Sequence, residues 1–557
     1  MRFVFIAFLI LGLVIGTQAV SDGDIQSDSF ELVELIHQTQ RTLSQLTPHD
    51  PILIDDNSDF VTLGATGNGS DSDPYILQNL EIKSTNSTPC IRVLGFVNAN
   101  FSLIGCSFSG TTLDNLYPPP HDANGSIDIR AGFATVQNCE VYNSTVGITI
   151  TTPYANIVGN SVWNCTNANA WVDGRHSTIR GNTFTRDGWK SLNSLVGSLT
   201  IENNRFLRGE YLSDSEQLHL QGNDYIIQHN IIECAFIGIY THGSNYYLYN
   251  NTFEVYDRIH SQGILNNMTV IDCIFRNATP DSFSSHLMTG RNSTILGCTF
   301  VNNDLGVSDV SSSEYSNISI SDCIFEGSAS IHMTDVSSEV RIYDCTFSGH
   351  NTDDYAIYGS EEFSVDIWNV DISGYELGIW LRGNNTRIHQ TQIQDCSRGI
   401  YIQGDGHFIS ENFVKSCRFS GIETWASNGI IRNNTLQWNE GGIRASSYFG
   451  CYDNQIFYNR FISNVLQAMD DGVNNVWDDG VSLGNYWSDY DGSGPYEVWG
   501  DAGAVDRWPM FIEPILPTTT PTEPPFGPPP GPPIIVILLG GVIVFAIVIY
   551  AVYRPRR

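Results

Sequence analysis

The chain repeats one short pattern four times, as GIWLR from Gly378, GIYIQ from Gly399, GIETW from Gly421 and GIRAS from Gly442. These starts lie 21, 22 and 21 residues apart. A second pattern, a polar residue two places before an apolar one, keeps the same period at Thr391, Asn412, Asn434 and Asn459. Repetition at this period is typical of a solenoid, in which each repeat buries its apolar face against its neighbours.

The second pattern continues towards the N-terminus with Asn, Cys or Val in its first place. It is found at Cys106, Cys139, Asn160, Asn182, Asn204, Asn230, Asn251, Cys273, Cys298, Cys323, Cys345 and Val370. The apolar runs are short, alternating and β-branched or aromatic, which favours strands over helices. A leucine-rich repeat has a similar period, but its L-x-x-L-x-L core is missing. We therefore predict an all-β fold, a right-handed parallel β-helix of about sixteen coils.

The first residue of this second pattern has two expected roles. Asn tolerates left-handed backbone at a tight corner, and stacked Asn side chains hydrogen-bond along a column. The apolar residue two places later should point inward beside it, because side chains alternate along a strand.

Composition and hydropathy divide the chain into seven expected parts. They are a signal peptide (1–19), an N-terminal cap with a helical pattern (20–48), the β-helix (49–476), a closing motif rich in Trp, Tyr, Gly and Asp (477–510), a Pro/Thr-rich stalk (511–533), a transmembrane helix (534–553) and a cytoplasmic tail (554–557). We expect a single-pass protein of the cell membrane with an extracellular ectodomain. The segment HDPILIDDNSDF, from His49 to Phe60, is expected to start the strand stack.

The formal net charge of −33 makes nucleic acid a poor partner. Thirteen N-x-S/T sequons are expected to include glycosylated sites in an exported chain. They begin at Asn68, Asn86, Asn100, Asn124, Asn143, Asn164, Asn250, Asn267, Asn277, Asn292, Asn317, Asn384 and Asn433.

Twelve cysteines in an exported chain normally suggest disulfides. Here Cys273, Cys298, Cys323 and Cys345 occupy one position in successive coils, so their Cβ vectors should run parallel, which is poor disulfide geometry. We predict a buried column of free thiols. Metal binding is the alternative, although C-x-x-C pairs are absent.

Three segments carry a resemblance to a known family: PILIDDNSDF with GNGSDSDPYILQNLEI, the Gly-Ile/Asn coils, and the closing GNYWSDYDGSGPYEVWGDAGAVDRWP. Over residues 49–510 the chain resembles archaeal surface proteins with NosD-like right-handed β-helix domains. The wider fold group includes pectate lyases, polygalacturonases and uronate epimerases. The resemblance implies a parallel β-helix with a carbohydrate-related or periplasmic accessory role, and NosD itself is associated with copper delivery.

Strand alternation predicts which side chains face outward. One outward file should contain His219, Tyr240, His332, Tyr358, Trp380, Tyr401, Glu423 and Arg444, and its neighbour Gln221, His242, Arg382, Gln403 and Trp425. Aromatic rings stack on sugars, and guanidinium or amide donors bind hydroxyls and carboxylates. We predict a polysaccharide-binding surface made of Tyr358, Trp380, Arg382, Tyr401, Gln403, Glu423, Trp425 and Arg444. The alternative is that large side chains simply cover an exposed sheet.

Acidic residues near this face are candidates for glycoside or lyase chemistry, which needs paired carboxylates or a metal with a base. They are Asp353, Asp354, Asp405 and Glu423, with His407 close in sequence. Separately, Asp489, Asp491 and Ser493 place oxygens at alternate positions and are candidates for a structural calcium site, with an Asx turn as the alternative. No other cofactor is expected.

These observations leave three function hypotheses. The first is non-enzymatic binding of polysaccharide or an envelope glycoprotein at the cell surface. The second is a carbohydrate-active enzyme, namely a lyase, hydrolase or epimerase. The third is a metal-accessory protein of the NosD kind.

Overall fold

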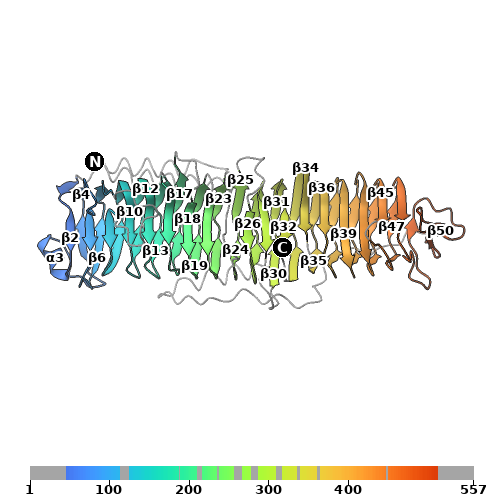
Figure 1. Ribbon diagram of the computed structural model, residues 1–557, viewed down its shortest axis with the longest axis horizontal. Coiled ribbons are helices and arrows are strands. Elements are labelled where there is room, and N and C mark those ends of the chain that lie inside the picture. Colours follow the sequence, from blue (N-terminus) through green and yellow to red (C-terminus); the bar gives the residue numbers. More distant parts are fainter. Residues whose placement is uncertain are drawn as a thin grey trace, which may run out of the picture. The chain divides into compact units, whose positions relative to one another are not determined.

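The computed structural model describes residues 46–511, apart from 113–124, 187, 210–215, 235–236, 256–265, 278–285, 309–316, 335–338, 361–363 and 447–449. These residues belong to one compact unit, Met1–Pro514. They form a parallel β-solenoid of about 16 turns, which confirms the all-β parallel solenoid of the predicted fold class (Figure 1).

Each turn of the solenoid contributes strands to three faces, which we call faces 1, 2 and 3. In the C-terminal half, face 1 contains β35 (Val365–Trp368), β37 (Arg387–His389), β40 (Phe408–Ser410), β43 (Ile430–Arg432) and β46 (Gln455–Phe457). Face 2 contains β38 (Gln392–Gln394), β41 (Phe413–Lys415), β44 (Thr435–Gln437) and β47 (Arg460–Ile462). Face 3 contains β39 (Arg398–Asp405), β42 (Ser420–Ser427), β45 (Gly441–Ala445) and β48 (Leu466–Asp470).

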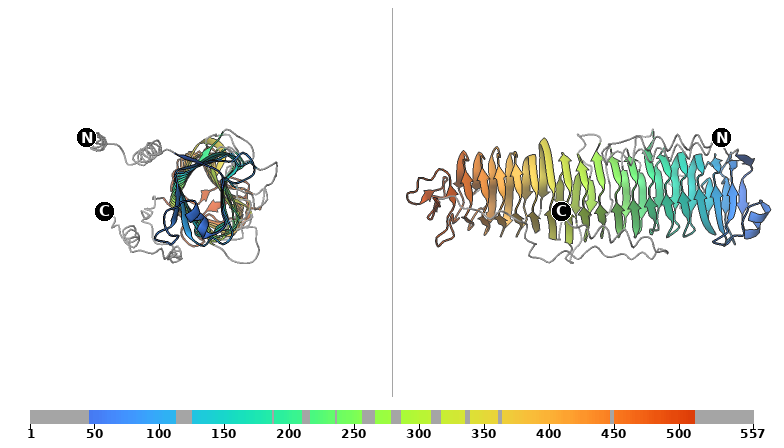
Figure 2. Two further views of the ribbon diagram at one scale, coloured as in Figure 1. Left: turned by 90° about the vertical axis from the view of Figure 1, so that its left-hand side faces the viewer. Right: turned by 180° about the vertical axis from the view of Figure 1, so that it is seen from behind.

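Faces 2 and 3 join into one sheet because some strands run through both. Examples are β34 (Thr346–Gly359) and β36 (Asp371–Leu381), which pair in parallel with two register shifts between Ser348 and Tyr355. The view along the axis shows the strands wound around a common interior (Figure 2). The core is one continuous cluster of buried side chains from Ile52 to Val498.

A column of asparagines runs along the corner between faces 1 and 2. The Asn434 amide oxygen accepts hydrogen bonds from the backbone N–H and Nδ2 of Asn412, at 3.0 and 2.9 Å. Asn434 in turn donates from its N–H and Nδ2 to the Asn459 amide oxygen, and from Nδ2 to the Ile409 carbonyl. The ladder predicted from the sequence is therefore present, and each rung satisfies donors of the preceding coil.

The expected left-handed residue was assigned one position too late. Asn203, Asn250 and Asn433 have φ between 48° and 57°, whereas the ladder asparagines that follow them do not have positive φ. The corner therefore uses two adjacent residues. The first turns the backbone, and the second supplies the inward amide.

The thiol column is confirmed. Strand pairs Ile274↔Thr299, Thr299↔Ile324 and Ile324↔Thr346 place the preceding cysteines one above another, and all four are buried and free. Each thiol donates to a carbonyl, as the Cys298 Sγ does to that of Leu296 at 3.4 Å. Behind this column stack the rings of Phe253, Phe275, Phe300, Phe325 and Phe347.

The N-terminal end differs from its prediction. The segment expected to be strand contains β1 (Thr47–His49) and β2 (Ile52–Ile54), followed by a short helix, α3 (Asn57–Thr62). Asp56 caps this helix, and the buried Phe60 ring stacks on Tyr75 at 5.0 Å, so α3 closes the first coils. Of the cap expected over 20–48, residues 20–45 lie outside the described residues, and Thr47 and Pro48 belong to β1. The expected signal peptide and the stalk, anchor and tail after 511 also lie outside the described residues. Among the residues that are described, no helix is long and apolar enough to cross a membrane.

The C-terminal end is closed by buried Trp and Asp residues. The last ladder residue, Asn485, donates its backbone N–H to Asp506 Oδ2 at 2.7 Å. The same oxygen accepts from Trp487 Nε1 at 2.9 Å, and Oδ1 accepts from the Trp508 N–H. Asp506 therefore takes the place of the next rung. Its burial raises the pKa of the carboxyl.

Replacing Asn434 by Ala should lower the free energy of unfolding by about 2–4 kcal/mol, because buried donors of Asn412 and the Ile409 carbonyl lose their partners. Asn434→Cys should lower the free energy of unfolding by less than Asn434→Ala does, since cysteine occupies this column in other coils. Urea unfolding of both variants checks this. Unchanged stability of the Ala variant would contradict the ladder's role.

Replacing Asp506 tests the C-terminal closure. Asp506→Ala should lower the free energy of unfolding by about 2–4 kcal/mol. Asp506→Asn should lower it by less, because the Asn side chain keeps an acceptor for Asn485 and Trp487. Because the folded pKa is raised, the native protein binds the proton more tightly than the unfolded chain. Wild type should therefore lose stability relative to Asp506→Asn as pH rises above about 4. Thermal unfolding followed by Trp fluorescence measures both effects; equal pH profiles would contradict the second.

Candidate functional site

The predicted outward file exists on face 3. Strand pairing aligns Tyr358, Trp380, Tyr401, Glu423 and Arg444 on β34, β36, β39, β42 and β45. The isoleucines that precede these residues are buried, because alternate side chains of a strand point to opposite sides. His332 precedes Tyr358 in the same file, on β32 (Ile331–Thr334).

The adjacent file contains Arg382, Gln403 and Trp425. Gln403 pairs with Trp425 across β39 and β42, and Arg382 follows Leu381, the partner of Ile402. Together the two files form what we call the aromatic face: Tyr358, Trp380, Arg382, Tyr401, Gln403, Glu423, Trp425 and Arg444. Strand register therefore aligns the predicted files from Tyr358 to Arg444, whereas His219, which was predicted to face outward, is buried. A role of these files in ligand binding stays a prediction.

The rings of the aromatic face do not form a flat platform. Trp380 meets Tyr401 edge-on, with centroids 5.7 Å apart and planes at 84°, and Tyr401 meets Trp425 at 59°. The Arg382 guanidinium lies 4.8 Å from the Trp380 ring centroid. A ligand therefore meets ring edges, ring faces and donors in alternation.

Two residues of the site were not predicted from the sequence. Tyr355 packs against Tyr358 and Trp380, each with centroids 5.0 Å apart, because the register shifts in β34 bring it onto the face. Arg398 donates from Nε to Glu423 Oε2 at 2.9 Å. It lies one coil before Glu423 but outside the Gly-Ile segments, where sequence analysis did not look.

Glu423 is occupied by protein donors. Besides Arg398, the Ser420 hydroxyl lies 3.3 Å from Oε2, and Trp425 Nε1 donates to Oε1 at 3.2 Å. The Gln403 amide donates to the Tyr401 hydroxyl at 2.9 Å, and burial raises the pKa of Tyr401. Glu423 thus holds Ser420 and Trp425 in place through hydrogen bonds, and its carboxylate pairs with the guanidinium of Arg398.

The other acidic candidates are dispersed. Asp405 is exposed at the end of β39 and accepts from Asn428 Nδ2 at 2.6 Å. Asp354 is half-buried on β34, and the side chain of Asp353 lies outside the described residues. Their proposed catalytic role stays a prediction.

His407 is buried at the corner between faces 3 and 1, between β39 and β40. Its Nε2 lies 3.1 Å from the Gln403 carbonyl, its Nδ1 has no partner, and burial lowers its pKa to about 4. The imidazole is therefore neutral at pH 7 and supports the backbone beneath Gln403.

Because the His407 pKa falls from 6.5 to about 4 on folding, the unfolded chain gains a proton between these values and the native protein does not. Stability should decline as pH falls across this window, by about 3 kcal/mol from this group. His407→Leu should show a shallower decline. Urea unfolding at pH 7 and pH 4.5 checks the difference, and identical slopes would contradict it.

In the closing motif, Asp491 Oδ1 accepts from the N–H and hydroxyl of Ser493, both at 2.9 Å, which is an Asx turn. Asp489 accepts from the Tyr496 hydroxyl and Gln467. Within the described residues, no group of three or more His, Cys, Asp or Glu side chains is arranged to hold a metal. The calcium site stays a prediction.

The upstream histidine of the outward file belongs to a network that sequence analysis missed. His219 stacks on Tyr240 with centroids 4.5 Å apart, and its Nδ1 lies 2.5 Å from Glu216 Oε2. The Lys190 amino group lies 3.6 Å from the same carboxylate, and burial lowers the pKa of Lys190. The sequence offers no signal for this pair, because residues three apart on a strand are expected on opposite faces.

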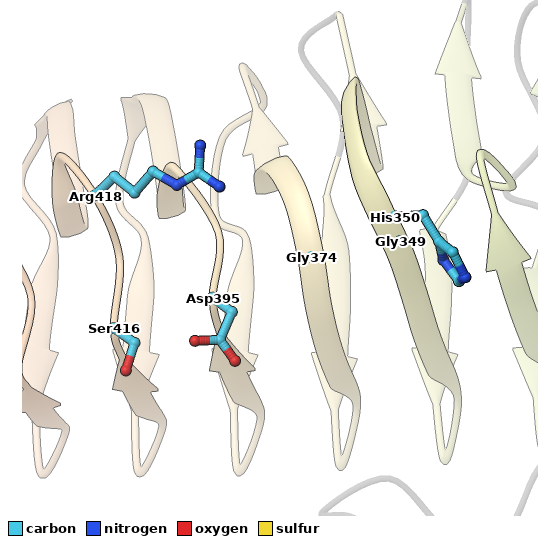
Figure 3. A pocket seen from close by; sticks show the side chains of 6 residues that line it. All are labelled: Gly349, His350, Gly374, Asp395, Ser416 and Arg418. Carbon is cyan, nitrogen blue, oxygen red and sulfur yellow. The ribbon is translucent and has the colours of Figure 1, made fainter.

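A shallow hollow lies at the corner between faces 2 and 3 (Figure 3). Its volume is about 510 Å³, and its lining residues are Gly349, His350, Gly374, Asp395, Ser416 and Arg418. It is lined by none of the residues of the aromatic face.

Most of the sequon asparagines are exposed. Asn68, Asn86, Asn143, Asn164, Asn250, Asn267, Asn292 and Asn317 are exposed; Asn100, Asn384 and Asn433 are half-buried; the side chains of Asn124 and Asn277 lie outside the described residues.

Comparison with protein families finds two matches. Residues 216–366 match the family described as "Right handed beta helix region", and residues 354–492 match "Periplasmic copper-binding protein (NosD)". The chain carries a right-handed β-helix domain. The second match spans the aromatic face of this β-helix and part of the closing motif.

Among solved structures, the β-helix is similar to the catalytic unit of a GH87 α-1,3-glucanase from Streptomyces thermodiastaticus strain HF3-3. The two sequences are 12% identical, the match covers 81% of this chain and 67% of that chain, and the TM-score is 0.21. It is also similar to the PL6 alginate lyase AlyGC, with 9% identity, 84% and 96% covered, and a TM-score of 0.23. Scores this low carry no argument about function. A comparison with curated proteins finds no match.

Proposed function

We propose that this protein binds a linear polysaccharide along the aromatic face, without chemical conversion of the sugar. The observation that carries the proposal is the alignment of Tyr358, Trp380 and Tyr401 in one file, with Arg382, Gln403 and Trp425 beside it. Parallel strands repeat about every 4.8 Å, so similar groups recur along the axis as sugar units recur along an extended polymer.

The chemistry of the face suits sugars. Half-buried rings offer apolar surface to the C–H faces of a pyranose, and the Arg382 guanidinium and Gln403 amide offer donors to hydroxyls. The half-buried Tyr343, Trp368 and His389 also stack in register, on face 1, with planes at 4° and 7°. Rings alone are therefore not diagnostic. Rings with an unpartnered donor occur on both faces: Trp380 Nε1 and Arg444 Nε on the aromatic face, and Arg432 Nε, whose guanidinium lies over the Phe408 ring, on face 1.

The proposal includes display at the cell surface. The apolar N-terminus, the Pro/Thr-rich segment 511–533 and the apolar run 534–553 support export and a single C-terminal anchor with an extracellular β-helix. The ligand would then be a polysaccharide of the surroundings or the sugar of an envelope glycoprotein.

The hydrogen bonds of Glu423 favour binding over the enzymatic alternative. Both of its oxygens accept from protein groups, so it is held as a structural anion beside Arg398. The metal-accessory alternative rests on the match of residues 354–492 to a family described as a periplasmic copper-binding protein.

Trp380→Ala and Trp425→Ala should each weaken polysaccharide binding by about tenfold, the effect of losing one stacked ring. A glycan-array screen of the full-length protein identifies the ligand, and titration of the best ligand measures the loss.

Trp368→Ala is the matched control. Trp368 is also half-buried in a stacked file, but it lies on β35 of face 1. Equal losses in all three variants would point to a general effect on the rod, and binding unchanged in both face variants would remove the aromatic face as the site.

A further inference from the structure

The C-terminal end of the β-helix exposes a concentration of large apolar side chains. Of the nineteen large apolar side chains that are exposed in the described part of the chain, eight lie within residues 465–511, and the other eleven are spread over residues 53–452. Exposed apolar surface of this density normally marks a contact with a protein or a membrane. Six of the eight belong to the closing motif, and we call them the closing end: Val481, Leu483, Trp499, Val505, Trp508 and Phe511.

The exposed rings of the closing end are not needed to cover the core. Trp477 and Trp487 of the same motif are buried in the core cluster, where they already seal the last coil. Trp499, Trp508 and Phe511 are instead 62%, 48% and 68% exposed. The closing motif therefore contains two sets of aromatic residues, one that closes the interior and one that faces outward.

Backbone hydrogen bonds hold the outward rings on different sides of the end. The Trp499 carbonyl accepts from the N–H of Asp470 at 2.7 Å, at the end of β48 on face 3. The Trp508 carbonyl accepts from the N–H of Gly484 at 3.0 Å. Gly484 in turn accepts from the N–H of Tyr458, which lies at the corner between faces 1 and 2. A flat partner at the end of the rod would therefore meet both indole rings.

The sequence beyond this end indicates the partner. Phe511 is followed by 22 residues rich in Pro and Thr, and then by the uncharged apolar run 534–553. A Pro-rich segment extends by about 3.1 Å per residue, so this one reaches at most roughly 70 Å. Trp side chains are enriched at the interface between headgroups and hydrocarbon, because they combine an apolar ring with a polar N–H. These observations favour a lipid surface over a second protein.

We propose that the closing end docks on the headgroup region of the bilayer that holds the expected C-terminal anchor. This inference rests on the anchored display that is part of the proposed function, and it adds a lipid contact made by the β-helix itself. Apolar side chains gain free energy when they leave water. Because the anchor keeps this end at a high effective concentration near the bilayer, even a weak contact is populated.

The charge of this end determines which lipids it accepts. Hydrogen bonds from backbone N–H groups lower the pKa of Asp479 and Asp491, so both carboxyls are ionised at neutral pH. The exposed Asp489, Glu497 and Asp501 add to this negative charge. Headgroups without net charge should therefore accept the closing end, whereas anionic headgroups should repel it.

The test uses the full-length protein inserted in vesicles of phosphatidylcholine that carries bromine high on its acyl chains. Bromine quenches Trp fluorescence on contact, and the apolar run 534–553 contains no Trp. Docking should therefore quench the emission of Trp499 and Trp508. The double variant Trp499→Phe/Trp508→Phe should lose most of this quenching, because Phe keeps the apolar contact but lacks the indole.

A second variant weakens the contact and leaves both indoles in place. Val481→Ser/Phe511→Ser removes two exposed apolar side chains of the closing end, so the quenching should fall by about half or more. Replacing part of the phosphatidylcholine by brominated phosphatidylglycerol, which is anionic, should also lower the quenching at low ionic strength. Added salt should restore it, because salt screens the repulsion.

Trp189→Phe is the matched control. Trp189 is also exposed, but it precedes β15 (Lys190–Ser194) in the N-terminal half of the β-helix. Its replacement should leave the quenching by brominated lipid unchanged. Circular dichroism of each variant checks that the β-helix is intact.

Three results would overturn the inference in distinguishable ways. If the protein resists extraction from the vesicles by carbonate but Trp499 and Trp508 are not quenched, the docking is wrong and the anchor stands. If carbonate removes the protein, the anchor and the proposed display fail together with the docking. If the emission of these two residues depends on protein concentration without quenching by lipid, the partner of the closing end is a second copy of the chain.

Discussion

The hydrogen bond from one coil's backbone N–H to the next coil's ladder amide fixes the structure on which everything else depends. In the runs Asn160–Asn230 and Asn412–Asn485, this bond recurs in every coil at 2.8–3.0 Å. A slip of one residue would remove the amide from the column and turn every side chain of the strand to the opposite side. The ladder therefore sets the register of the interior and of the outward files together.

The ladder column tolerates both Asn and Cys because the position requires only a small side chain that can donate one hydrogen bond and accept another. A thiol donates to a backbone carbonyl as the Asn amide does. The Cys273 sulfur also accepts a hydrogen bond from the Asn251 backbone nitrogen, at 3.5 Å, although an amide oxygen at this position would accept it more strongly. Thiols are also small enough to leave room for the phenylalanine stack behind them. Cysteine and asparagine are thus partial equivalents here, and the thiols need no redox or metal role to explain their position.

The period and the Gly-Ile alternation were enough to predict the solenoid, the thiol column and both outward files, because in a repeating backbone a shared position in the repeat means a shared location. The left-handed residue was misplaced because Asn203-Asn204, Asn250-Asn251 and Asn433-Asn434 put the same residue type in both roles. Tyr355 was missed because the register shifts in β34 interrupt the repeat. Ring tilts and the Arg398–Glu423 pair depend on rotamers, which no periodicity encodes.

The ladder and the aromatic face differ in how fully their donors are satisfied, although buried groups elsewhere, such as Arg432 Nε on face 1, also have no partner. Along the ladder, Asn412, Asn434 and Asn459 each donate from the backbone and from Nδ2 to defined acceptors. On the aromatic face, the same protein leaves Trp380 Nε1 and Arg444 Nε without acceptors and Arg382 without an acid. Unsatisfied donors lower stability, and such departures from local rules are expected at functional sites. A chain with more than twice as many acidic residues as Lys and Arg has ample means to pair two arginines. That it leaves them unpaired beside half-buried rings is consistent with a surface completed by an oxygen-rich ligand.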